Sequence, residues 1–444
     1  LQALLVTGLG GIALLAGLIL LGIQTGEWTV SGVLGSGAVP ASASLLIPIQ
    51  LLFLLGAFTK SAQVPFHFWL PNAMVAPTPV SAFLHSATMV KAGVFLIGRF
   101  SPVLGEGGIW DALVIPVGAA TLLTGAVLGL VQTDLKKILA YTTLAVLGLL
   151  TLLLGVGTEL AIKSAILFLI GHALYKAALF MTTGAVDHAC GTRELPALGG
   201  LRRVMPITAA AAILATLSKA GFPPFFGFLG KEYVYKSGAG LAGGEWFIAV
   251  TFLGNLVLLA LAFRAGFAPF WSKPNPETAQ KAHEVDPLLW ISPLVLGVTG
   301  TIAGLFPGSL FGPLVTLAAA PIAGSPVPVE LKLWHGFGLP VLLSAGTLGG
   351  GVLLYALLPR VDGALRRLPG ALPTTADRVY DACFHGMLAV AGWQTRVIQS
   401  GYLRNYLLTI AMTTVGLLFY KFYRWGRFPA LAEQSPVDPH LAGL

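Results

Sequence analysis

Lysine and histidine residues interrupt the apolar stretches of this sequence, most clearly within residues 51–100. Lys60 stands in an apolar run that Pro65 then breaks, because a proline inside a helix removes a backbone hydrogen bond. The next apolar segment is expected to be a second helix, with His85 and Lys91 at its middle. Basic groups at membrane depth usually face a protein interior or a water-filled cavity, and burial favours the neutral form of a lysine. This pattern predicts a proton path beside a broken helix.

A second basic pair, His172 and Lys176, stands in the apolar segment 159–183. Residues four apart share one helix face, and a neutral imidazole there can pass a proton to a lysine. The alternative is a histidine that only fills a packing position. We favour the relay because two basic groups share one apolar face. Lys163, near the start of the segment, is expected to reach the membrane surface.

The composition indicates an all-α, polytopic membrane protein. Over 444 residues the chain is 56% hydrophobic and 10% charged, with a mean hydropathy of +0.83. A soluble fold of this size needs far more polar surface. The net charge of +8 is most simply explained by basic residues in loops that face the cytoplasm. No basic soluble module is present, so nucleic-acid binding is not expected.

The sequence gives no indication of a cofactor or a metal. Cys190 and Cys383 are far apart and show no CxxC spacing, so neither an iron–sulfur cluster nor a disulfide framework is expected. No Rossmann or P-loop glycine motif precedes a helix, so we expect no nucleotide or flavin.

A second interrupted helix is visible within residues 205–238. Lys60, Pro65, Phe66 and Leu70 align with Lys219, Pro224, Phe225 and Leu229, which makes a weak internal repeat. Paired interrupted helices in corresponding positions usually mark the central site of a transporter. The prolines expected to break the two helices are Pro65, Pro223 and Pro224.

The segment TDLKK begins another apolar helix. Thr133 is the expected N-cap, and Asp134 suits the positive helix start. Lys136 follows one turn into the helix. Two interpretations stay open for it, a position in the headgroup region or a position in a proton channel.

The stretch KSAQVPFHFWLPNAMVAPTPVSAFLHSATMVKAG resembles the signature of the antiporter-like membrane subunits. These are shared by respiratory complex I, membrane-bound hydrogenases and Mrp-type multisubunit Na+/H+ antiporters. FHFWLPNAM with LHSATMVKAG is most similar to the A-type subunit of the Mrp antiporters. The resemblance implies about 10–11 transmembrane helices, two broken helices in inverted repeats, and water-filled half-channels.

The resemblance also assigns site residues. His172 and Lys176 match the family's HAxxKA motif, and the family's lysine in the second broken helix corresponds to Lys231, followed here by Glu232. Lys219 stands where relatives generally have an apolar residue. Asp187, His188 and Arg193 resemble a DHxxGTR segment, for which loop bracing or a proton exit is expected. The complete expected proton path comprises Lys60, His85, Lys91, Lys136, His172, Lys176, Lys231 and Glu232.

The expected organisation follows the chain. Residues 1–131 form a first antiporter-like half, for which the resemblance implies missing N-terminal helices with an essential glutamate, and residues 132–270 form a second half. Residues 271–370 add further transmembrane helices, among which residues 311–329 are expected to lie across a surface. Residues 371–402 are expected to form a lateral amphipathic helix. Residues 403–444 provide a C-terminal transmembrane helix and tail, after which relatives continue.

The expected function is that of a multi-pass cell-membrane subunit in a hetero-oligomeric Mrp-type complex that exchanges Na+ for H+. Acidic residues are few in the spans, and a hard cation prefers oxygen ligands. We therefore expect the sodium path to involve partner subunits or the missing portions of the chain. One alternative is a proton-pumping subunit of a complex I-like dehydrogenase or a hydrogenase. The other alternative is a non-conducting scaffold. The lysines within the spans argue against it, because a scaffold gains nothing from buried charge.

Overall fold

The computed structural model describes residues 1–35, 43–105, 107–327, 330–333, 336–365, 375–399 and 401–425. Over these residues the chain is helical, and a single bridge between Asp134 and Glu194 is its only β-type pairing. The chain divides into two units, Leu1–Ala376 and Asp377–Leu444, and each is described by itself.

Within the described residues, nine helical segments are long and apolar enough to cross a membrane. The all-α polytopic prediction is thereby confirmed. The segments are α1 (Gln2–Thr25), α5 with α6 (Thr78–Ser86 and Ala92–Leu104), α7 (Trp110–Leu130), α8 (Leu135–Val156), α9 (Glu159–Cys190), α12 with α13 (Glu245–Ala262 and Ala268–Trp271), α15 (Pro287–Leu305), α17 (Leu339–Leu365) and α20 (Leu403–Trp425). Three shorter apolar helices add to these: α3 (Ala43–Lys60), α10 (Pro206–Ala220) and α16 (Pro307–Ala323).

Both predicted broken helices are present. α3 ends at Lys60, and two 3₁₀ turns with the short α4 (Trp69–Asn72) follow before α5. α10 ends at Ala220, and α11 (Phe226–Ala239) resumes after Gly221, whose φ of 74° is left-handed. A cis peptide bond lies in each break, at Val64–Pro65 and at Pro223–Pro224.

The segment carrying His85 and Lys91 is interrupted, although we predicted a continuous helix. α5 ends at Ser86, and a 3₁₀ turn at Met89–Lys91 leads into α6. The Lys91 ammonium donates hydrogen bonds to the carbonyls of His85, at 2.5 Å, and of Ser86. These carbonyls lie in the last turn of α5, where no further turn supplies N–H donors. The Lys91 ammonium therefore supplies the hydrogen-bond donors for the carbonyls at this interruption.

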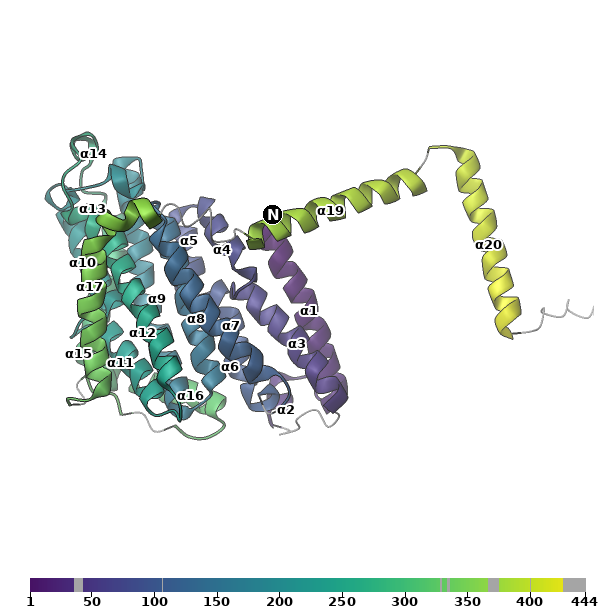
Figure 1. Ribbon diagram of the computed structural model, residues 1–444, viewed down its shortest axis with the longest axis horizontal. Coiled ribbons are helices and arrows are strands. Elements are labelled where there is room, and N and C mark those ends of the chain that lie inside the picture. The colour runs from purple at the N-terminus through teal and green to yellow at the C-terminus, as the bar shows by residue number, and fades with distance from the viewer. Residues whose placement is uncertain are drawn as a thin grey trace, which may run out of the picture. The chain divides into compact units, whose positions relative to one another are not determined.

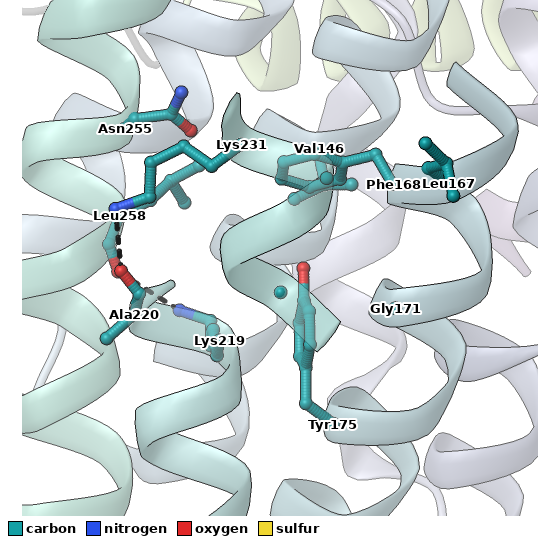
Figure 2. Close-up of a pocket in the computed structure, with 12 residues that line it drawn as sticks. Val146, Leu167, Phe168, Gly171, Tyr175, Lys219, Ala220, Lys231, Asn255 and Leu258 are labelled. Atoms are coloured by element: carbon teal, nitrogen blue, oxygen red, sulfur yellow. Dashed lines mark hydrogen bonds between the residues drawn. The ribbon is translucent and has the colours of Figure 1, made fainter. Parts of the chain in front are cut away.

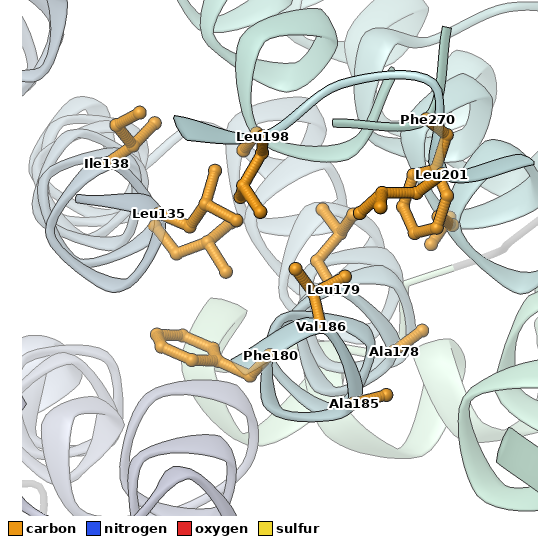
Figure 3. Packing of buried hydrophobic residues seen from close by; sticks show 14 of the residues in the cluster. Leu135, Ile138, Ala178, Leu179, Phe180, Ala185, Val186, Leu198, Leu201 and Phe270 are labelled. Carbon is orange, nitrogen blue, oxygen red and sulfur yellow. The ribbon is translucent and has the colours of Figure 1, made fainter. Parts of the chain in front are cut away.

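α8 lies at the centre of the first unit, beside α7 (Figure 1). The two backbones approach closely through glycines, as small residues allow between membrane helices. A Cβ added at Gly148 would lie 2.3 Å from the backbone N of Leu122, and one at Gly118 would lie 2.5 Å from the N of Leu152. On its other side α8 contacts α9, and the apolar side chains between them include Leu135, Ile138, Leu179 and Phe180 (Figure 3).

Three further expectations need correction. The N-cap of α8 is Asp134 and not Thr133, because the Asp134 carboxylate accepts from the N–H groups of Lys136 and Lys137. α9 continues to Cys190, beyond the predicted end at residue 183, and Gly191 terminates it in a left-handed conformation. Residues 311–323 belong to α16, which packs against α9 and α6 and buries Val315 and Ala319. They do not lie across a surface.

The remaining helices of the first unit are α2 (Val30–Gly35) and α14 (Pro276–Lys281). α19 (Thr375–Ile398) begins at the boundary of the units, and α20 follows it. The side chains of α19 that are described are mostly exposed, Met387 and Trp393 among them. The division into two halves, further spans, a lateral helix at 371–402 and a C-terminal segment stays a prediction, and residues 371–374, 400 and 426–444 lie outside the described residues.

Candidate functional site

The interruption between α5 and α6 places Lys91 next to the end of the first broken helix. The Ser61 hydroxyl donates to the Val90 carbonyl at 2.7 Å and accepts from the N–H of Val94 at 3.0 Å. Residue 61 follows Lys60, and residue 90 precedes Lys91. The two lysines are thus joined through neighbouring backbone, although their side chains differ, since Lys91 is buried while Lys60 is partly exposed.

Lys136 is buried, and Lys137 is exposed. The Lys136 ammonium donates to the carbonyl of Ala76 at 2.6 Å and to that of Met74 at 3.4 Å. Both carbonyls belong to the turn between α4 and α5. The sequence left two interpretations open for Lys136, a headgroup position and a position in a proton channel. A headgroup position would expose the ammonium, so the buried geometry does not fit that interpretation.

Lys176 and His172 point into the interior from α9, and both are fully buried. The Lys176 ammonium donates to the Leu139 carbonyl at 2.5 Å and to the Thr142 hydroxyl, both on α8. It also lies 5.7 Å from the centre of the Phe180 ring, within the range of a cation–π contact. The same ring lies 5.1 Å from the imidazole of His85. Phe180 thus connects the basic residues of α5 with those of α9.

His85 and His172 are buried side chains whose rings contact Phe180 and Tyr175, respectively. Neither ring nitrogen of either residue has a hydrogen bond within the described part of the chain. Buried polar groups are nearly always paired, and water is the usual partner where protein supplies none. Bound water is therefore the expected partner of both imidazoles, which lie among the buried lysines of this row.

A cavity continues this row of residues into the second broken helix (Figure 2). It measures about 20 Å³ and is lined by Tyr175, Lys219, Lys231 and Asn255 among others, which is enough volume for a water molecule with polar neighbours. The Lys231 ammonium donates to the Ala220 carbonyl at 2.7 Å, and that of Lys219 donates to the Leu258 carbonyl at 3.2 Å. Five helices, α8, α9, α10, α11 and α12, contribute residues to its lining.

The backbone break after α10 leaves space for the Lys231 side chain. A Cβ at Gly221 would lie 2.3 Å from the Cε atom of Lys231 and would displace that side chain. The left-handed backbone of residue 221 also favours glycine. Glu232 follows on α11 and is also buried, but it is not among the residues that line this cavity. The prolines Pro223 and Pro224 lie within the same break.

The loop after α9 is braced by charges. Arg193 donates from Nε to the Asp134 carboxylate at 2.6 Å, and Asp187 lies 3.7 Å from another guanidinium nitrogen. The hydrogen bond to Asp134 is the main reason that the pKa of the Arg193 guanidinium is raised above its usual value. His188 lies in the last turn of α9 and is exposed. The ion pairs hold the start of α8, from which Lys136 projects.

Sequence reasoning did not identify every residue of this row. Two of the missed residues are marked in the sequence. Tyr175 stands directly before Lys176, and Asn255 is a polar residue in the otherwise apolar run FLGNLVLLAL. Lys219 was aligned with Lys60 but not placed in the proton path. The position of Phe180 between the basic residues could not be predicted from the sequence, because an aromatic residue on an apolar helix face is usually a packing residue.

Known proteins resemble the chain over this same region. Residues 1–264 match the protein family described as "NADH:quinone oxidoreductase/Mrp antiporter, TM". The chain belongs to this family. An A-type Na(+)/H(+) antiporter subunit of Alkalihalophilus pseudofirmus is 36% identical over 459 residues, which cover 96% of this chain and 56% of that protein. A probable K(+)/H(+) antiporter subunit of type A/B from Rhizobium meliloti is 41% identical over 364 residues, covering 80% of this chain and 36% of that protein.

A solved structure shares the antiporter-family fold. A chain in "Structure of Mrp complex from Dietzia sp. DQ12-45-1b" matches with a TM-score of 0.83 and 34% identity, covering 99% of this chain and 48% of that one. The predicted resemblance to the A-type subunits of Na+/H+ antiporters is confirmed. The chain spans about half the length or less of these relatives.

Proposed function

We propose that this chain is one membrane subunit of a multi-component antiporter that exchanges a monovalent cation, Na+, for protons across the cell membrane. The observation that carries the proposal is the pair of fully buried histidines, His85 and His172, whose ring nitrogens lack partners within the described residues. Buried lysines stand on either side of them. A chain with no proton to move gains nothing from this arrangement, because each buried basic group is costly in a membrane.

The proposed proton path runs along the row of basic residues. Lys136 donates to a carbonyl of the turn between α4 and α5, and Lys91 donates to carbonyls at the end of α5. His85 and Lys176 contact the same Phe180 ring, and Tyr175 lines the cavity of the second broken helix. A lysine in this row passes on a proton when its ammonium becomes a neutral amine, and a histidine or a water accepts it. Each ammonium is held by one or two oxygens, which orient it without neutralising it.

Lys60, His188 and Glu232 have less defined places in this path. The Lys60 ammonium has no hydrogen bond or ion pair within the described residues, and Lys60 stands at the end of α3. We assign Lys60 the first step of proton uptake, Glu232 a place within the second broken helix, on α11, and His188 an exit. Asp187 and Arg193 brace the loop. These roles rest on position and on the family resemblance.

Sodium is proposed as the second substrate because the relatives are named Na+/H+ antiporter subunits. Moving one charge across 100 mV corresponds to about 2.3 kcal/mol, so a few protons can drive the expulsion of one ion. We place the sodium path largely in partner subunits, because the row described here consists of basic groups and not of the oxygens that a hard cation prefers.

A redox-driven proton pump is the second candidate, since the family description also includes NADH:quinone oxidoreductases. The two functions differ in what drives the protons. Inverted membrane vesicles that carry the complete complex are given a Na+ pulse, and proton movement is followed with a pH-sensitive dye. Antiport predicts movement without any electron donor and its loss in Lys60→Ala. Movement that appears only after NADH or another donor is added would contradict antiport, and an unchanged rate in an assembled Lys60→Ala complex would remove Lys60 from the path.

A further inference from the structure

The second broken helix carries one lysine on each side of its break. Lys219 is in the last turn of α10, and Lys231 lies on α11. Both side chains line the same cavity of about 20 Å³ (Figure 2). A cavity of this size holds about one water molecule. One water in the cavity is therefore a common neighbour of both lysines.

Each of these two lysines is held by a carbonyl oxygen and not by a carboxylate. The Lys231 ammonium donates to the Ala220 carbonyl at 2.7 Å, and the Lys219 ammonium donates to the Leu258 carbonyl at 3.2 Å. Ala220 and Leu258 also line the cavity, and no acidic side chain is among its described lining residues. Ala220 ends α10, and a helix C-terminus attracts a positive charge. The site therefore favours one positive charge, and nothing in the lining compensates a second.

Two ammonium groups at one water-sized cavity repel each other, and a lysine relieves this repulsion by releasing its proton. We propose that Lys219 and Lys231 share one proton, which crosses the break through water in the cavity. One ammonium gives a proton to the water while the water gives a proton to the neutral amine of the other lysine. One N–H bond breaks and another forms, so the pair keeps a single positive charge. The inference rests on the proposed function and deepens it, because Lys219 becomes a second proton-carrying residue beside Lys231.

A merely structural role would leave both lysines permanently charged, with each ammonium holding its own carbonyl. Lys219→Met, Lys231→Met and their double variant remove the proton together with the hydrogen bond. A second cycle, with glutamine at the same two positions, keeps an N–H donor that cannot carry the proton. It also decides the question for any complex that methionine prevents from assembling. Lys236→Met is the matched control, because Lys236 also lies on α11 but is exposed. Na+-driven proton movement is measured in inverted vesicles, per assembled complex.

A shared proton predicts that each single variant at Lys219 or Lys231 slows proton movement by about 100-fold, as the loss of a positioned proton-transfer group typically does. Each double variant should be no slower than the slower of its single variants, because either loss already breaks the same step. Lys236→Met should keep the original rate. An original rate in Lys219→Gln, or single effects that multiply in the double variants, would overturn the shared proton.

Failure of the proposed function has a separate signature. Lys176→Met is measured alongside, and an unchanged rate in that variant would contradict the proton path itself, so the shared proton would fall with it. A slow Lys176→Met complex beside original rates in both Lys219 variants would overturn the shared proton alone.

Discussion

Replacing Asp134 should destabilise the protein more than replacing an ordinary helix cap. Its carboxylate accepts from the N–H groups of Lys136 and Lys137, at 2.8 and 3.2 Å, and from Arg193 at 2.6 Å. Losing a side-chain cap costs about 1 kcal/mol. Losing the charged hydrogen bond costs about 1.5–3 kcal/mol, which we discount to about 1 because Arg193 is about one-third exposed. Asp134→Ala should therefore lower the free energy of unfolding by about 2 kcal/mol, and Asp134→Asn, which keeps a cap acceptor, by about half as much.

The assay is thermal unfolding of the purified complex in detergent, with Thr158→Ala as control. Thr158 caps α9 through a 3.3 Å bond to the Ala161 N–H and has no ion pair within the described residues. The predicted order of Tm is unaltered chain, then Asp134→Asn and Thr158→Ala together, then Asp134→Ala. Equal Tm values for Asp134→Ala and Thr158→Ala would refute the contribution of the ion pair.

The pH dependence of this ion pair has a definite sign. Because the pKa of Arg193 is raised, its stabilisation is complete below the ordinary arginine pKa and is lost only as pH rises through the higher folded value. The difference between Asp134→Ala and Thr158→Ala should therefore be the same at pH 7 and pH 9. A difference that shrinks by pH 9 would mean that another group holds the loop.

Three further changes test separate parts of the structure. Gly148→Ala places a methyl group against the backbone of Leu122, and we expect a loss of about 1–3 kcal/mol, seen as a lower Tm; an unchanged Tm would contradict the close approach of α7 and α8. Lys219→Met should slow Na+-driven proton movement in vesicles, since the cavity loses one ammonium, and an unchanged rate would leave Lys219 a structural donor only. Trp69→Phe removes the donor to the Thr59 carbonyl, 3.0 Å away, and should cost about 1 kcal/mol; a Tm equal to that of the unaltered complex would show that water replaces this bond.

The sequence predicted those parts of the fold that depend on local chemistry. Pro65 and Pro224 mark the two broken helices, because a proline interrupts a helix whatever that helix packs against. The four-residue spacing of His172 and Lys176 likewise places both on one helix face, and both are buried there. These signals are written into neighbouring residues and need no knowledge of the packing.

The parts that failed depend on contacts between distant residues. The break after Ser86 has no proline or glycine, and the Lys91 ammonium satisfies its carbonyls. Only the packing of α8 shows that Lys136 is buried and Lys137 exposed. α16 is rich in alanine and proline, as a surface segment can be, but its small residues let it pack closely against α9. The cavity at Lys219 and Lys231 likewise forms only where five helices meet.

The most direct test of the proton path compares two lysines of the same helix. Lys176 is fully buried on α9, whereas Lys163 near its start pairs with Glu159 at 2.9 Å. Na+-driven proton movement is measured in inverted vesicles with Lys176→Met and Lys163→Met complexes at equal assembly. The proposed path predicts that Lys176→Met abolishes the movement and that Lys163→Met keeps it. Equal rates in the two variants would contradict a proton path through the interior of this chain.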